Sequence, residues 1–203
     1  MANDPKAKSK PTAEPSVVLL DAMEAYPSRT FEDWRAHADA VVLAEVVSER
    51  RVEPLEDATA PKRFPVSRKI AIKVSDVYWE RPGANPPAEF EMEAFGWMTL
   101  ENDEEVPMVA PDASRLEVGH RYLLAVHDIE RATRAGDVVR WTVLGSGGAL
   151  PADAQIGVGE LEARKVAAPE QRSAESEVVA DALAGLSLRE AEEVIRQSLR
   201  STR

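Results

Sequence analysis

The chain has 203 residues, 44% of them hydrophobic, and a formal net charge of -11 at pH 7. This length suits one domain with appendages, or two very small domains, and the apolar content is enough for a core. The negative charge argues against a general electrostatic affinity for nucleic acid or anionic membranes. The sequence contains no cysteine, which excludes disulfides and thiolate metal sites.

Residues 1–15 are polar and contain three prolines, which predicts a disordered tail. Asp4 and Pro5 stand where a secretory signal would have its apolar segment. No apolar run approaches the roughly 20 residues that span a bilayer. We therefore expect a cytoplasmic protein that does not enter membranes, or an extracytoplasmic one if the sequence follows a removed leader.

The predicted barrel domain, residues 16–159, is organised around one strand near its beginning. Residues 17–20 fit either a short strand or a helical turn. Thr30 has the character of a helix N-cap, with Asp33 in the capping-box position, so a short helix is expected next. Residues 37–52 are rich in valine and lack glycine and proline, which predicts a central strand with later strands around it.

Further extended segments show apolar alternation or short apolar runs between turn-forming residues. They are residues 69–79, 88–94, 122–126 and 138–144, with a last short piece at 155–158. The alternation in the first of them slips at Asp76 and Val77, as a β-bulge would cause. The second places Glu89, Glu91 and Glu93 on one wet face. Residues 53–65 and 100–116 are expected to be loops, the latter acidic. The mostly local connections predict a mainly β fold, a small antiparallel barrel.

A C-terminal helical hairpin, residues 173–203, is predicted beyond a charged connector at 160–172. The first helix ends at Gly185, and Ser187 with Glu190 forms a capping box for the second. The second helix carries an apolar stripe made of Leu188, Ala191, Val194, Ile195 and Leu199. Most such terminal helices pack on their own domain. The stripe is nevertheless the candidate partner-binding surface, for another protein or for self-association.

Three segments share the pattern of a known family. Residues 38–47 contain Ala-Asp-Ala-Val, residues 72–79 end in Tyr-Trp, and residues 118–125 contain Gly-His-Arg-Tyr-Leu. This pattern resembles the netrin and tissue-inhibitor-of-metalloproteinase type of OB-fold domain over about residues 37–150. The resemblance implies an OB-like barrel that binds macromolecules rather than catalyses. The inhibitor members use an N-terminal cysteine that this chain lacks, so protease inhibition is not implied.

Residues with catalytic or metal-binding chemistry are scattered. His120 and His127 flank one predicted strand and, on a regular strand, would face opposite sides. The acidic loop around Asp103 lacks the glycine and spacing of an EF-hand. We therefore predict no catalytic, cofactor or metal site and a non-catalytic protein-interaction module. A metal-assisted enzyme that combines His120 or His127 with carboxylates of the acidic loop is the first alternative.

The second alternative is a single-stranded nucleic-acid binder. Basic residues bracket the loop between the first two barrel strands, as in OB-folds that hold a nucleic-acid strand. These residues are Arg50, Arg51, Lys62, Arg63, Arg68, Lys69 and Lys73. The neighbouring acidic strand and loop would repel phosphate, which argues against this function.

The run Gly-Ser-Gly-Gly at residues 145–148 superficially suggests a phosphate-binding loop. Such a loop needs a helix N-terminus directly after the glycines, and usually a lysine. Neither follows here, so the run is predicted to be a flexible strand exit.

Overall fold

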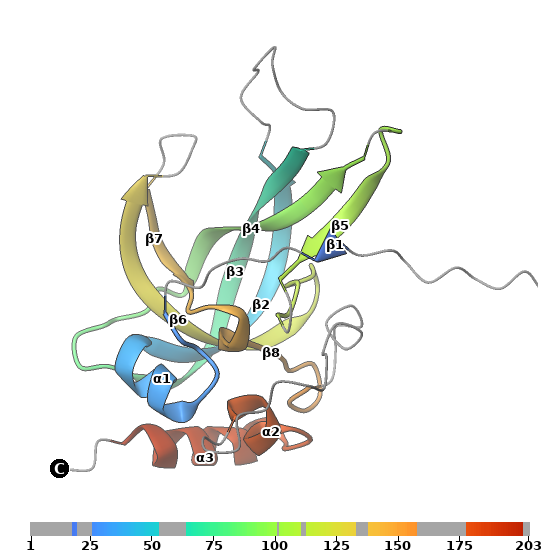
Figure 1. Ribbon diagram of the computed structural model, residues 1–203. Helices are drawn as coiled ribbons and strands as arrows, with labels where there is room; N and C mark the ends of the chain where they lie inside the picture. Colours follow the sequence, from blue (N-terminus) through green and yellow to red (C-terminus); the bar gives the residue numbers. More distant parts are fainter. Residues whose placement is uncertain are drawn as a thin grey trace, which may run out of the picture.

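The computed structural model describes residues 18–19, 26–52, 64–100, 102–110, 113–132, 138–157 and 178–200. The predicted tail at 1–15 and the connector at 160–172 lie outside these residues. In the described part, antiparallel strands curl into a half-barrel, and three short helices lie together at one end of it (Figure 1). The prediction of a mainly β fold is confirmed. No helix in these residues is long and apolar enough to cross a bilayer.

The strands are β1 (Val18–Leu19), β2 (Ala40–Arg51), β3 (Phe64–Glu80), β4 (Glu89–Thr99), β5 (Glu105–Val109), β6 (Arg121–Ala132), β7 (Val138–Val143) and β8 (Ala149–Pro151). The helices are α1 (Phe31–His37), α2 (Val179–Leu183) and α3 (Leu188–Leu199), with a 3-10 turn η1 (Ser146–Gly148). The order across the sheet is β1-β5-β4-β3-β2-β6-β7, and β8 pairs with β6. All neighbours are antiparallel except β1, which runs parallel to β5.

The central strand is β2, as the sequence predicts. It pairs with β3 on one side and β6 on the other. Its first residues are buried on both faces, because Val42 belongs to the core inside the half-barrel while Val41 and Leu43 belong to the core under the helices. A strand covered on both sides has a continuous apolar run instead of alternation. The bulge expected near Asp76 and Val77 is present as two shifts in the β2–β3 register.

Two predicted loops contain strand residues. β3 begins at Phe64, so the end of the predicted loop 53–65 belongs to it. Residues 105–109, predicted to lie in the acidic loop, form β5. Pro107 argues against a strand in sequence terms, but β1 pairs with Met108 and Val109 only, so Pro107 pairs with β4 alone, where a residue without an N–H is tolerated. The predicted extended piece at 155–158 was wrong in its described part, where residues 155–157 form an isolated bridge and a turn.

Helix α1 is fixed at both ends. Thr30 accepts a hydrogen bond from the Asp33 amide at 3.1 Å, and the Asp33 carboxylate accepts the Thr30 amide at 2.9 Å, which is the predicted capping box. At the other end, the guanidinium of Arg81 donates to the carbonyls of Arg35, Ala36 and Ala38. A cation at this position also opposes the partial negative charge of the helix C-terminus.

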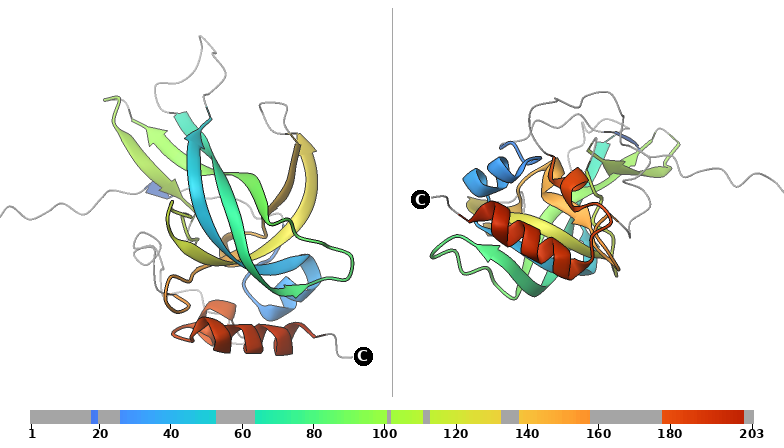
Figure 2. Two further views of the ribbon diagram at one scale, coloured as in Figure 1. Left: turned by 180° about the vertical axis from the view of Figure 1, so that it is seen from behind. Right: turned by 90° about the horizontal axis from the view of Figure 1, so that it is seen from below.

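Helices α1, α2 and α3 cover one end of the outer sheet surface, as the view from below shows (Figure 2). The capping box of Ser187 and Glu190 at the start of α3 is present. The core beneath the helices joins Trp34 of α1 to Leu123 of β6 and Leu183 of α2. A separate core fills the inside of the half-barrel. On the outer face of β3 and β4, Lys73, Glu89, Glu91 and Phe95 are exposed, whereas Lys69 is buried.

Candidate functional site

The predicted partner-binding stripe of α3 packs on this chain's own sheet. Ala191, Ile195 and Leu199 are fully buried, and Leu188 and Val194 are partly buried against the same core. This is the packing expected of most amphipathic terminal helices. In this arrangement the stripe is covered by the chain's own sheet.

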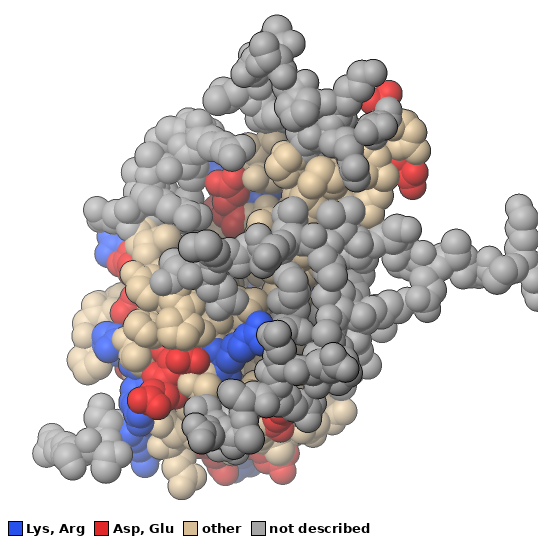
Figure 3. Space-filling view, viewed as in Figure 1, with Lys and Arg blue, Asp and Glu red and all other residues tan. Residues whose placement is uncertain are grey.

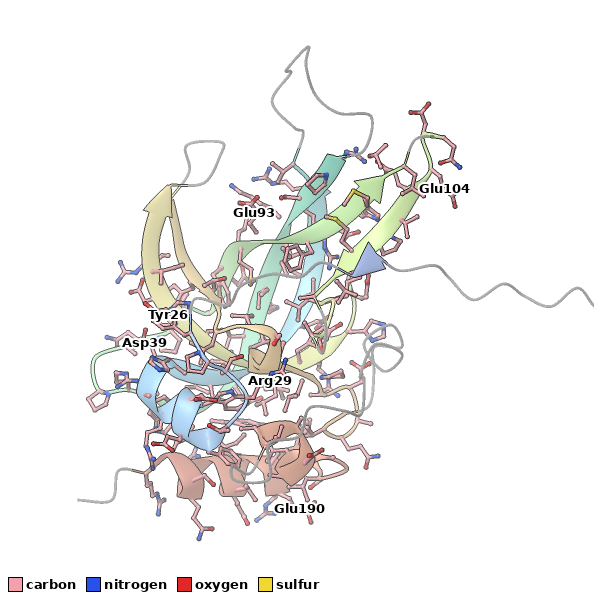
Figure 4. All side chains as sticks on the ribbon, viewed as in Figure 1. Tyr26, Arg29, Asp39, Glu93, Glu104 and Glu190 are labelled. Atoms are coloured by element: carbon pink, nitrogen blue, oxygen red, sulfur yellow. The ribbon has the colours of Figure 1, made fainter. Side chains whose placement is uncertain are left out.

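The three histidines lie in two separate places. His120 hydrogen-bonds to Asp153, whereas the rings of His37 and His127 flank Tyr26 at centroid distances of 5.1 and 5.4 Å. Tyr26 lies beside α1, far from Glu104 at the tip of the β4–β5 hairpin (Figure 4). In the described ranges no three potential ligands gather into a metal site. The loop residues Glu101 and Asp112 lie outside those ranges.

His120, Arg121 and Asp153 form a polar cluster. Asp153 accepts the Arg121 amide at 2.7 Å and bonds to the Nδ1 atom of His120 at 2.6 Å. The Arg121 guanidinium donates to the Asp153 carbonyl. Burial raises the pKa of Asp153, but the Arg121 amide and His120 outweigh it and hold the pKa below 3.8. The cluster pins the turn after β8, where Ile156 bonds to the backbone of the α2–α3 linker. Its geometry fits a structural anchor.

Replacing Asp153 with asparagine is expected to lower the free energy of unfolding by about 1 kcal/mol at neutral pH. Asparagine keeps an oxygen for the Arg121 amide but loses the negative charge. A carboxylate whose pKa is lowered by folding stabilises above its unfolded pKa, and the gain is lost as the pH falls below it. Urea titrations at several pH values measure the difference in unfolding free energy between wild type and Asp153→Asn. This difference should shrink as the pH falls below 3.8, the ordinary pKa of the carboxyl group. A difference independent of pH would contradict this role.

The residues of the predicted basic hairpin are engaged within the fold. Arg50 Nη2 lies 3.6 Å from Glu91 Oε2, and Arg51 Nη1 lies 2.5 Å from Glu105 Oε1. Arg68 is completely buried, and the other described residues, Lys69 and Lys73, lie opposite glutamates in the β3–β4 register. Lys62 and Arg63 lie outside the described residues. Cations paired in this way offer little to a phosphate backbone.

The glycine run at 145–148 serves close packing. The Gly147 amide donates to the Ser28 hydroxyl at 3.0 Å, and a Cβ on Gly147 would lie 2.7 Å from the Ser28 carbonyl oxygen. Glycine is therefore required for this turn to reach the segment before α1. The run forms η1 rather than a loop before a long helix.

Two buried arginines brace a β-bulge in β4. The register slips between Val66 and Ser67, which leaves Gly96 as the extra residue of β4. A Cβ on Gly96 would lie 2.4 Å from the Val66 carbonyl oxygen, so only glycine fits. Arg68 Nε donates to the Phe95 carbonyl at 2.8 Å, and the same guanidinium pairs with Glu49 and donates to the Arg115 carbonyl.

Arg115 completes this brace from the loop before β6. Its guanidinium lies 5.4 Å from the Trp97 ring centroid, and its Nε lies 2.7 Å from Glu117. Its Nη1 donates to the carbonyls of Phe95, Gly96 and Met108. Two buried arginines therefore converge on one carbonyl, that of Phe95. The backbone there is rigidly held.

The side chain of Phe95 points away from this brace into solvent. Its exposed fraction is 41%, although the residue stands in the middle of a strand. The register places Ser67 beside it, and the strand alternation puts Glu91 and Glu93 on the same outer face. Acidic side chains are visible at the place that Glu93 occupies (Figures 3 and 4). The ring of Phe95 is therefore exposed and bordered by charged side chains, on a backbone that is held in place.

The residues that carry the family resemblance have structural roles in this chain. Asp39, in the first motif, accepts the Asp128 amide at 2.9 Å and pairs with Arg81. In the third, Gly119 adopts a positive φ of 84° at a turn. Tyr122 is buried, and its hydroxyl accepts the Glu117 amide at 2.7 Å. These residues of the motifs therefore fix turns and strand ends of the sheet.

Sequence reasoning missed Phe95 and the two arginines that brace it. The available signal was a Phe-Gly pair at the point where β4 alternation breaks, since a glycine inside a strand often marks a bulge. No protein-family model, curated protein or solved structure matches this chain.

Proposed function

We propose that this protein is a non-catalytic protein-interaction module that docks through Phe95 and the outer face of β3 and β4. The observation that carries the proposal is the contrast at Phe95, where the backbone is held by two buried arginines and the ring is left in solvent. Rigid aromatic anchors lose little entropy on binding, and for that reason they dominate many interfaces.

The polar groups of the described residues support a non-catalytic role. His120, Asp153 and Asp39 are engaged in hydrogen bonds that fix turns and strand ends. A general base needs a reacting group within hydrogen-bond reach, and a nucleophile needs a base beside it. The interactions found around these residues are instead those of anchors. We extend the proposal to an OB-like identity of the barrel, supported by its curled antiparallel sheet, in which β2 pairs with β3 on one side and β6 on the other.

The test uses the full chain and its Phe95→Ala variant as baits in a lysate of the native cell. The affinity of each purified partner is then measured for both forms. Val118→Ala is the matched control, because Val118 is a similarly exposed apolar residue outside this face. We expect wild type and Val118→Ala to bind equally, and Phe95→Ala to bind about 30-fold more weakly. Circular dichroism checks that both variants fold. A partner that binds Phe95→Ala as tightly as wild type would contradict the proposed surface.

A further inference from the structure

The edge of the sheet at β5 holds a short strand that comes from a distant part of the sequence. β1 pairs in parallel with Met108 and Val109 and lies beside β5 (Figure 1). On β5, the pairing with β4 covers only Glu105, Val106 and Pro107. β1 is therefore the last strand at this end of the sheet, and it is two residues long.

The place where β1 pairs is apolar on both faces of β5. Met108 and Val109 are each only 1% exposed, and consecutive residues of a strand point to opposite faces. A strand that is covered on both faces has a continuous apolar run instead of alternation. Residues 16–20 read Ser-Val-Val-Leu-Leu, which is such a run. A strand that pairs at this edge is thus expected to be apolar at consecutive positions.

The pairing between β1 and β5 is short enough to be exchanged. A two-residue ladder forms few hydrogen bonds, and parallel pairing is slightly less stable per residue than antiparallel pairing. Residues 20–30 separate β1 from α1, so β1 is not joined to its neighbour by a tight turn. A sheet edge can accept an added strand through its backbone N–H and C=O groups, while side-chain contacts give specificity.

We infer that the edge of β5 is a strand-addition site, which binds an extended apolar segment of another protein in parallel orientation. β1 is the chain's own displaceable occupant of this site. The inference goes beyond the proposed function, because strand addition needs neither the ring of Phe95 nor the outer face of β3 and β4.

The test uses the full chain and a fluorescent peptide with the sequence of residues 14–22. Fluorescence anisotropy measures the Kd of this peptide for wild type and for a variant that combines Val18→Gly with Leu19→Gly. Glycine disfavours the strand, so β1 of the variant competes less, and the peptide should bind about tenfold more tightly. A peptide with the same two glycines is the control and should bind neither protein. Phe95→Ala should bind the peptide as wild type does.

An engineered disulfide allows the comparison within one protein. The chain has no cysteine, so Val18→Cys with Met108→Cys introduces a single pair, at positions that are partners in the β1–β5 register. Oxidation should close the bond within one chain and abolish peptide binding, and reduction should restore it. Both measurements use the same variant, so any effect of the substitutions on stability is present in each.

Other outcomes overturn the inference. Peptide binding that persists in the oxidised variant places the peptide at another surface, and a glycine variant that gains no affinity contradicts a displaceable β1. This second result decides the question even if the cysteine variant does not fold. A disulfide that links two chains makes β1 of a second copy the occupant, which contradicts the assignment to another protein. The proposed function is tested separately, by the partners that Phe95→Ala loses.

Discussion

Replacing Arg68 with alanine is expected to lower the free energy of unfolding by about 2–5 kcal/mol, through the cavity and the lost hydrogen bonds. Its side chain is completely buried and holds three partners, namely Glu49 and the carbonyls of Phe95 and Arg115. Removal leaves a cavity and leaves the Arg115 carbonyl without this donor in a buried site, whereas the Glu49 side chain is 31% exposed and can be hydrated. A buried carbonyl without a donor loses hydration without compensation, which costs more than the net gain from a hydrogen bond in the intact protein. Urea or guanidinium titration measures the loss.

The matched control is Arg50→Ala. Arg50 also sits in a strand and pairs with a glutamate, but both side chains are more than half exposed. Exposed pairs contribute at most about 1 kcal/mol, so Arg50→Ala should change stability by about 0.5 kcal/mol or less. If the two variants lost equal stability, burial would not be the reason for the effect. Arg68→Met, which keeps the volume but no donors, separates the lost hydrogen bonds from the cavity.

Local signals were sufficient for the elements that local interactions define. The capping boxes at Thr30 and Ser187 were predicted because each needs only residues three positions apart. The two-sided burial of β2 follows from its unbroken apolar run, and the bulge near Asp76 follows from a slip in alternation. These features do not depend on which distant strand comes alongside.

Features that depend on distant partners were not predictable. Arg68 looked like part of a basic surface, because charge along the chain says nothing about burial. Its partners come from β2, β4 and the loop that contains Arg115, so the network exists only once the sheet has formed. β5 also depends on a distant partner, because its residues form a strand by pairing with β4 despite Pro107. Phe95 lies just beyond the predicted strand 88–94, although in the structure the alternation of Glu89, Glu91 and Glu93 continues to it and the register shifts only at Gly96.

The second large effect on stability is expected at Ile195, in the apolar stripe of α3 that packs on the sheet. Ile195→Ala is expected to lower the free energy of unfolding by about 2–5 kcal/mol, because the side chain is fully buried in the core between α3 and the sheet. The loss combines the reduced apolar burial with the cavity left beside its neighbours. Gln197→Ala, on the exposed side of the same helix, is the control and should change stability by about 0.5 kcal/mol or less.

The same variant distinguishes an integral α3 from a detachable one. If α3 belongs to the cooperative unit of the barrel, chemical unfolding followed by tryptophan fluorescence and by circular dichroism will show one coincident transition, shifted as a whole by Ile195→Ala. If α3 detaches first, the variant will show an early transition that leaves the barrel intact. The stripe of Leu188, Ala191, Val194, Ile195 and Leu199 would then be accessible to a partner while the sheet stays folded. A single transition instead leaves the outer face of β3 and β4 as the surface for association.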